Sequence, residues 1–143
     1  MSANQNPYKF VALVNKNLEP GVALNALGHA ALGMGATLAV SHVAEMQLLD
    51  FRDRDGQSHP SISALSLIVL RGTSGNIRAL RKEANARSLP YVDFTTTMTC
   101  GNYTEQLERT AQTPEEDLEY SVIILFGESD VLASLTKKYS LYR

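Results

Sequence analysis

Two stretches of this sequence carry side chains that could act on a ligand or a substrate. In the first, a polar turn with Asn15 and Lys16 leads into a long apolar segment that holds one histidine, His29. A lysine beside the start of a helix is suited to hold an anion, because the free backbone amides there carry partial positive charge. The second stretch is the run TTTMTC, which ends at Cys100 and supplies hydroxyls and a thiol.

The threonine run suggests a polar pocket. On a strand, Thr95, Thr97 and Thr99 would share one face, because successive side chains alternate. Cys100 precedes an expected helix, whose dipole favours a thiolate, and His29 would then act as its base. Simpler interpretations stay open: hydroxyls satisfied within the fold, an unreactive cysteine, and a core histidine bonded to a protein group.

The sequence therefore gives two sets of candidate site residues. The candidate catalytic residues are His29, Thr97, Thr99 and Cys100. The candidate ligand-binding residues are Asn15, Lys16, Gly21, Asn25 and Thr95. No pair of histidines or carboxylates has the spacing of metal ligands, so the sequence predicts neither a metal site nor a cofactor.

Basic residues gather on and beside one expected helix: Arg71, Arg78, Arg81, Lys82 and Arg87. They could contact phosphates, but charged residues on a helix more often form a solvated face. The interleaved aromatic residues of a single-strand binder are missing. The formal net charge of the chain is −2, so it lacks the basic field that dominates non-specific nucleic-acid binding. Nucleic acid is therefore an unfavoured partner, although a local patch keeps it open.

Length and composition predict one domain that spans residues 1–143. The single cysteine, Cys100, cannot form an internal disulfide, which favours a reducing compartment. The first residues lack the pattern of a signal peptide, and no apolar run approaches the roughly 18 residues of a membrane span. We therefore expect a soluble cytoplasmic protein without a membrane partner.

Strand and helix patterns alternate along the chain. The expected strands are Tyr8–Val14, Ser63–Leu70, Tyr91–Thr97 and Tyr120–Phe126, with a short edge strand at Ser140–Tyr142. The expected helices are Gly21–Ala39, Ile77–Arg87, Asn102–Gln112 and Gly127–Lys138. Ala44–Leu49 fits a short helix or a strand, and Asp55-Gly56 signals a hairpin turn. This order predicts an α/β fold in three layers, with helices on both faces of a mixed, mostly parallel sheet of about four to five strands.

The expected helix Gly21–Ala39 is apolar all round, which predicts burial against more than one neighbour. Its small residues would let a sheet or a partner helix approach closely. Ser74 or Asn76 is the expected cap of the next helix, and Ser129 or Asp130 is the expected cap of the last one.

The string FVALVNKNL, followed by GVALNALGHAA, resembles the opening of the peptidyl-tRNA hydrolase II fold. Those enzymes begin with a lysine and a Val-rich strand, and continue through a short turn into a helix of the type Ala-Ala-Gln-x-x-His-Ala. Segments further along, such as Leu80–Pro90 and Ser121–Gly127, resemble later elements of that fold in pattern and order. The resemblance covers most of the chain apart from Asn102–Glu119, and it implies a homodimer.

This chain departs from the hydrolases at the charged positions. Val22 stands where they use a lysine, Ala26 falls on their helix glutamine, and their aspartate falls near Thr95 or Thr96. Both charges that could position a water or stabilise an oxyanion are thus replaced. The resemblance therefore implies the scaffold but not its reaction.

Two functions remain. In the first, the chain binds a small polar or peptide-like ligand between the Asn15–Gly21 turn and the Thr95–Cys100 run, without catalysis. In the second, it hydrolyses ester or amide bonds, with His29 acting together with Thr97, Thr99 or Cys100. RNA binding through the arginine-bearing helix is a weaker third hypothesis.

Overall fold

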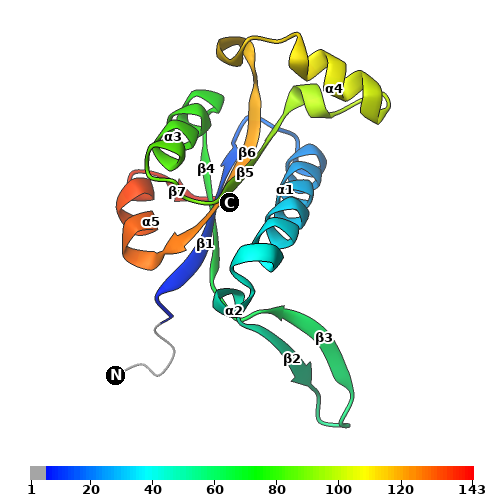
Figure 1. The fold of residues 1–143 in the computed structure, drawn as a ribbon, viewed down its shortest axis with the longest axis vertical. Helices are drawn as coiled ribbons and strands as arrows, with labels where there is room; N and C mark the ends of the chain where they lie inside the picture. The colour runs from blue at the N-terminus through cyan, green and yellow to red at the C-terminus, as the bar shows by residue number, and fades with distance from the viewer. Residues whose placement is uncertain (1–5) are drawn as a thin grey trace.

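A mixed sheet forms the centre of the molecule, and a hairpin extends away from it (Figure 1). The computed structural model describes residues 6–143. The strands are β1 (Tyr8–Asn15), β2 (Leu48–Arg52), β3 (Ser58–Ser63), β4 (Leu67–Gly72), β5 (Tyr91–Thr95), β6 (Tyr120–Glu128) and β7 (Ser140–Leu141). The helices are α1 (Pro20–Ser41), α2 (Val43–Met46), α3 (Ser74–Ala86), α4 (Tyr103–Ala111) and α5 (Ser129–Thr136), with 3-10 turns η1 (Thr96–Met98) and η2 (Glu115–Asp117).

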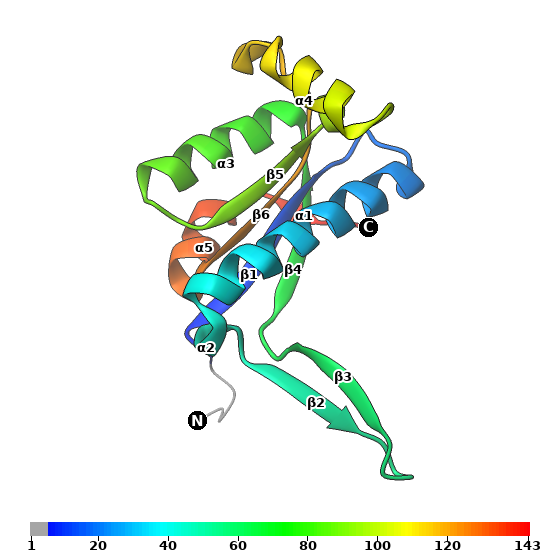
Figure 2. The same cartoon turned by 45° about the vertical axis from the view of Figure 1, so that its right-hand side comes forward.

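In residues 6–143 the central sheet has five strands, in the order β5-β6-β1-β4-β7. The α/β class and the mixed sheet are confirmed, but the expectation of mostly parallel strands is wrong. Only β1 and β4 of this sheet are parallel, and its other neighbouring pairs are antiparallel. The reason is the path between β5 and β6, because α4 lies beyond the end of the sheet instead of crossing a face (Figures 1 and 2). The chain thus returns beside β5 in the opposite direction.

Alternation along β1 divides the core between the two faces of the sheet. Phe10, Ala12 and Val14 pack on the face that α1 covers. Val11 and Leu13 pack on the other face, with residues of α3 and α5. The central strands are therefore buried on both sides, which explains the unbroken apolar runs FVALV and SVIILF in the sequence.

The helix α1 lies across β5, β6 and β1 (Figure 2). Its buried residues form one stripe: Ala23, Ala26, Ala30, Met34 and Leu38. The sequence predicts burial of this helix against more than one neighbour, whereas its buried residues form a single stripe and Leu24 and Leu32 are exposed. Its length and composition fit a membrane span, a test that core helices of soluble proteins also pass.

The hairpin of β2 and β3, called here the arm (Leu48–Ser63), projects from the body in both views (Figures 1 and 2). The predicted turn lies at its tip, where Gly56 has a φ of +82°. The Asp53 carboxylate accepts hydrogen bonds from the backbone amides of Asp55 and Gln57, both at 3.0 Å. The ambiguous segment Ala44–Leu49 divides between α2 and the start of β2.

Several element boundaries differ from the expectation. The expected strand Ser63–Leu70 is two strands, because β3 ends at Ser63 and β4 begins at Leu67. The expected strand Tyr91–Thr97 ends at Thr95, where the chain turns into η1. Thr97 and Thr99 therefore do not continue one strand face with Thr95, and the predicted alternation fails there.

The helix caps also differ in detail. Thr73 caps α3 and forms a capping box with Asn76, in which each side chain accepts a hydrogen bond from the backbone amide of the other. The residue before α5 is Glu128, and its side chain makes no cap hydrogen bond. Ser129 and Asp130 instead lie inside the first turn of α5.

Candidate functional site

The carboxyl end of β1 lies beside the start of β6 and the end of β5, and there the threonine hydroxyls bond to one another. The Thr95 and Thr97 hydroxyl oxygens are 2.7 Å apart, and Thr110 of α4 donates to Thr97 at 2.8 Å. Thr95 is fully buried and Thr97 nearly so. The structure thus brings these two candidates together, but their hydroxyls are occupied within the protein.

Arg109 of α4 holds the rest of the threonine run. Its guanidinium donates to the carbonyl oxygens of Thr97 at 3.1 Å and Thr99 at 2.6 Å, and to that of Cys100 at 3.3 Å. The Thr99 hydroxyl donates to the Thr96 carbonyl at 2.7 Å. Cys100 is exposed, with a φ of 60° in the left-handed region. This loop is therefore fixed by backbone contacts to one charged side chain.

Asn15 ends β1 and is buried. Its side-chain amide donates to the Tyr120 carbonyl at 2.9 Å, and its carbonyl oxygen accepts from the Asn17 amide at 2.9 Å. Lys16 is exposed, and its backbone amide donates to Gly72 at 2.8 Å. Asn15 therefore joins β1 to β6, and its polar atoms are already used.

His29 lies on the surface of α1, so its interpretation as a core histidine is wrong. Its ring stacks on Phe94 of β5, with centroids 5.4 Å apart and 15° between the planes. Gly21 and Asn25 are also exposed, and Asn25 lies one helical turn before His29. Among residues 6–143, no hydrogen bond joins His29 to Thr97, Thr99 or Cys100, or to a lysine or aspartate.

The arginines of α3 are mostly committed to carboxylates. Arg78 pairs with Glu115 at 3.1 Å and also donates to the Leu118 carbonyl at 2.6 Å. Arg81 pairs with Asp93 of β5 at 3.0 Å. Because these charges are neutralised locally, α3 offers less free positive charge than its sequence suggests.

Three ionisable groups beside α3 have shifted pKa values. Burial raises the pKa of the Tyr120 hydroxyl to about 12, and its hydrogen bond to Glu115 adds to this shift. The same hydrogen bond, 2.7 Å long, lowers the pKa of the Glu115 carboxyl. Burial raises the pKa of Asp93, and the nearby Arg81 opposes that shift.

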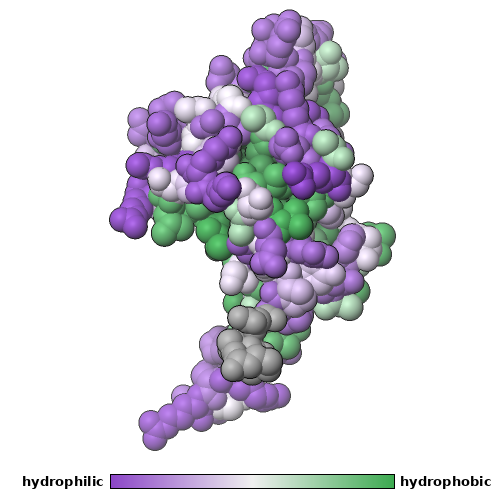
Figure 3. Space-filling model, turned by 90° about the vertical axis from the view of Figure 1, so that its left-hand side faces the viewer, coloured by the Kyte–Doolittle hydropathy of each residue, from purple (hydrophilic) through white to green (hydrophobic). Residues whose placement is uncertain are grey.

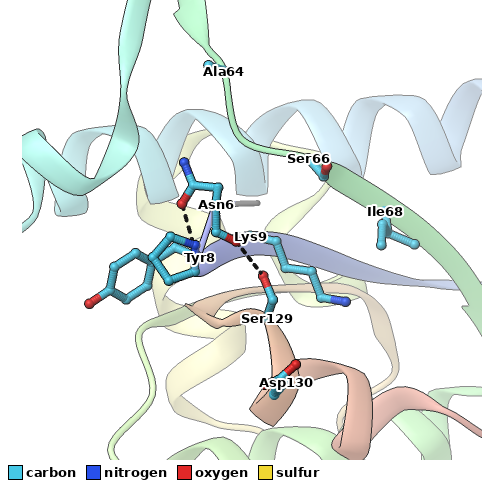
Figure 4. Close-up of a pocket in the computed structure, with 9 residues that line it drawn as sticks. Asn6, Tyr8, Lys9, Ala64, Ser66, Ile68, Ser129 and Asp130 are labelled. Atoms are coloured by element: carbon cyan, nitrogen blue, oxygen red, sulfur yellow. Dashed lines mark hydrogen bonds between the residues drawn. The ribbon is translucent and has the colours of Figure 1, made fainter. Parts of the chain in front are cut away.

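The opposite end of β1 borders a polar cavity of about 580 Å³ (Figure 4). Its lining residues are Asn6, Pro7, Tyr8, Lys9, Ala64, Ser66, Ile68, Ser129 and Asp130. The Lys9 side chain extends along the cavity between β4 and α5, and Asp130 lies on the α5 side (Figure 4). Within residues 6–143, no ion pair joins Lys9 to Asp130. The cavity therefore presents both charges to its contents.

Hydrogen bonds fix the wall of this polar cavity. The Ser129 amide donates to the Pro7 carbonyl at 2.7 Å, and the Ser129 hydroxyl donates to the Asn6 carbonyl at 3.3 Å. The Tyr8 amide donates to the Asn6 side chain at 3.0 Å. The segment before β1 is thus tied to the first turn of α5.

A second, mainly apolar cavity of about 720 Å³, called here the apolar groove, lies between α1 and the base of the arm. Its larger apolar side chains include Leu32, Met34, Leu48, Ile62 and Leu67. None of the nine candidate residues from the sequence lines the polar cavity or the apolar groove. In the part of the chain that the structure describes, no cluster of three His, Cys, Asp or Glu side chains could hold a metal ion.

Sequence analysis missed Lys9, Ser66, Ser129 and Asp130 as site residues. Lys9 carried a usable signal, because a charged residue inside the otherwise apolar strand YKFVALV needs a polar environment. Ser66 and Asp130 carried no such sequence signal, because only the pairing of β1 with β4 and β6 brings them to Lys9.

The chain is similar to solved structures and matches a family model. No curated protein matches the chain. Among solved structures, the chain is similar to an uncharacterised protein, Atu0240, from Agrobacterium tumefaciens strain C58. The two share 14% identity and a TM-score of 0.79, over 96% of this chain and 98% of the other. That likeness supports the fold alone. The model of a family described as protein of unknown function (DUF2000) matches residues 8–143, and the chain therefore belongs to the DUF2000 family.

Proposed function

We propose that this protein binds a small zwitterionic, peptide-like ligand in the polar cavity and does not transform it. The observation that carries the proposal is the placement of Lys9 and Asp130 on one cavity without an ion pair between them. An ammonium attracts a carboxylate, and a carboxylate attracts an ammonium. A ligand with one charge at each end would satisfy both.

The size and lining of the cavity support this ligand class. Its volume of about 580 Å³ falls within the range of roughly 300–1,000 Å³ that is usual for small-ligand sites. Ser66 and Ser129 add hydroxyls, and Tyr8 and Ile68 add apolar surface for a short side chain. Asp130 belongs to the first turn of α5, where an acidic residue is favourable.

The other end of β1 supports the proposal by contrast. There Asn15, Thr95 and Thr97 already bond to protein groups, so a ligand would have to displace those bonds. Breaking hydrogen bonds of buried groups costs about 1–3 kcal/mol each. In the polar cavity, Lys9 and Asp130 do not pair with each other, so a ligand that binds both displaces no ion pair between them.

NMR with dialanine as the probe tests this proposal. We expect dialanine to shift the backbone amides of Lys9, Ser66 and Asp130 in a saturable titration. N-acetylated dialanine should bind at least about 10-fold more weakly, because it cannot pair with Asp130. C-amidated dialanine should weaken similarly, because it cannot pair with Lys9.

Paired variants assign each charge to one ligand end. Lys9→Met should weaken dialanine but leave the amidated peptide unchanged, and Asp130→Asn should do the same for the acetylated peptide. Lys138→Met and Asp117→Asn are controls on exposed positions outside the cavity. Shifts confined to other residues, or none up to 10 mM by order of magnitude, would reject the proposal.

The hydrolase remains a second candidate because of one observation. His29 is exposed and stacks on Phe94, directly before the threonine run. A solvent-accessible imidazole could act as a base on a bound ester. Turnover of aryl esters or peptidyl-tRNA that disappears in His29→Ala would favour hydrolysis, whereas no turnover in the wild type would exclude it for those substrates.

We also propose a scaffold of the peptidyl-tRNA hydrolase II type and a cytoplasmic location. The scaffold is supported by the order strand, turn, helix at β1 and α1, with His29 in the helix. The location is supported by Cys100, a single exposed thiol of the kind that reducing compartments preserve. Fractionation of the source cells, with blotting for the native protein, tests the location.

A further inference from the structure

Large apolar side chains are exposed along one continuous part of the molecule, called here the docking surface. It consists of Leu32 on α1, Leu67 on β4 and four residues of the arm: Leu48, Leu49, Phe51 and Ile62. Contiguous exposed apolar patches of several hundred Å², by order of magnitude, usually mark interaction sites.

The docking surface consists of the apolar groove and the part of the arm next to it. Leu32, Leu67 and Ile62 line the apolar groove, together with Leu48 at the base of the arm. Leu49 pairs across the arm with Ile62, and Phe51 follows two residues later, beyond a register shift between Leu49 and Phe51. Exposed apolar side chains of the arm thus continue outward from the groove.

The described chain leaves this surface without a cover. α1 crosses β5, β6 and β1 but does not reach over β4. Gly28 and Gly35 lie on the groove side of α1, and a Cβ at either position would meet no atom within 4 Å. A lone two-stranded hairpin is marginal in water, so the arm gains from packing against another layer.

We propose that a second copy of this chain occupies the docking surface, so that the arm of each copy packs on α1 and β4 of the other. The area supports a dimer. From their exposed fractions, the six side chains present on the order of 600 Å². A standard interface buries about 800 Å² on each partner, of which roughly 57% is apolar. The docking surface therefore supplies enough apolar area for a stable dimer.

The charges around the surface favour a protein partner over a lipid one. α1 carries no charged side chain, and the arm has three aspartates against two arginines. Anionic membranes recruit surfaces with an excess of lysine and arginine, which this surface lacks. Figure 3 shows the arm as a narrow extension with a hydrophilic tip. At that tip Arg52, Asp53, Arg54 and Asp55 alternate in sign, so two copies related by a two-fold axis do not accumulate like charges.

Sedimentation velocity over a concentration series tests the dimer. We expect the wild type to sediment as a dimer at tens of micromolar, by order of magnitude for an interface of this size. Leu49→Asp should raise the dimer dissociation constant at least about 30-fold, as for an interface hot spot. Leu107→Asp on α4 is the matched control, because Leu107 is 54% exposed and Leu49 is 51% exposed. It should leave the dimer unchanged.

Three results would overturn the proposal. The first is a wild type that stays monomeric at 200 µM, a concentration on the order of which even weak interfaces populate dimers. The second is a dimer that Leu107→Asp disrupts and Leu49→Asp does not. The third is a monomer that binds phosphatidylcholine–phosphatidylglycerol vesicles through Leu49. Circular dichroism of Leu49→Asp confirms folding, and dialanine binding is measured separately because the polar cavity lies outside the docking surface.

Discussion

The two ends of β1 differ in how their polar side chains are satisfied. At the carboxyl end, Asn15 bonds to Tyr120 and Asn17, and Thr95, Thr97 and Thr110 bond to one another. At the amino end, Lys9 and Asp130 line an open cavity and do not pair with each other (Figure 4). The richer cluster in the sequence is therefore the one that serves structure, and the sparser cluster is the one that stays available.

This difference shows why polar residue types alone do not locate a site. A buried hydroxyl or amide must find a partner, since leaving it unpaired costs about 1–3 kcal/mol. Clusters of threonine and asparagine therefore form readily as internal networks. Lys9 and Asp130 differ from these clusters, because they share a cavity and do not pair with each other, although Asp130 is also favourable in the first turn of α5.

Among changes at the carboxyl end of β1, removing the Arg109 guanidinium should have the largest effect on the free energy of unfolding. Arg109→Met deletes the donor that holds the carbonyls of Thr97, Thr99 and Cys100, and should cost about 2–3 kcal/mol in the free energy of unfolding. Urea unfolding monitored by circular dichroism measures this. Arg87→Met, which breaks only an exposed pair with Glu83, should cost less than about 0.5 kcal/mol. Equal losses in both variants would contradict the structural role of Arg109.

Thr97→Val should have a smaller effect at the same end. It keeps the shape of the side chain but leaves the buried Thr95 hydroxyl without its partner, so we expect a loss of about 1–2 kcal/mol. Thr104→Val, at an exposed position of α4, is the control and should change stability by less than about 0.5 kcal/mol. A neutral Thr97→Val would mean that the hydroxyl network is not needed, and would reopen Thr97 as a site residue.

Alkaline pH tests the Tyr120–Glu115 contact, which lies at the carboxyl end as well. The pKa of Tyr120 is raised from 10.0 to about 12, so the folded protein keeps this proton after the unfolded chain has lost it. Its contribution to stability is therefore complete below pH 10 and is lost as the pH rises to about 12.

Tyr120→Phe should flatten the fall in stability across that pH window, as measured by urea unfolding at several pH values. The exposed Tyr103→Phe should retain the slope of the wild type. The same slope in the wild type and Tyr120→Phe would show that this hydroxyl titrates alike in the folded and unfolded chains.

Lys9→Met should have the smallest effect on folding and so sharpen the contrast between the two ends. Lys9 is partly exposed to the polar cavity, and we expect its loss to change the free energy of unfolding by less than about 0.5 kcal/mol. Thermal and urea unfolding measure this. A loss above about 1.5 kcal/mol would show that Lys9 serves the fold, and would remove the contrast on which the proposed ligand site depends.

Much of the fold could be predicted from local pattern. The runs at Phe10–Val14 and Tyr120–Phe126 predicted the central strands, and the Asp55-Gly56 pair predicted the turn of the arm. These signals are local, since alternation, burial and turn geometry depend on neighbouring residues. The direction of β6 was not predictable, because it depends on where α4 lies relative to the sheet.

The candidate site was less predictable than the fold. Sequence reasoning named Asn15, Thr95 and Thr97, which the fold does bring to one end of the sheet. It assigned Asn15 and Thr95 to ligand binding and Thr97 to catalysis. It could not detect their partners, because Tyr120 and Thr110 are distant in the chain. It also predicted that α1 is buried against more than one neighbour, whereas Leu32 is exposed on the docking surface.

By itself, the sequence determined the α/β class, the central strands and the hairpin turn. These depend on residue type and short-range spacing, which the chain carries explicitly. Only the tertiary structure decided strand direction, which polar groups are already satisfied, and that Lys9 and Asp130 share a cavity. Those properties depend on contacts between residues far apart in the chain, and the packing of the whole molecule selects them.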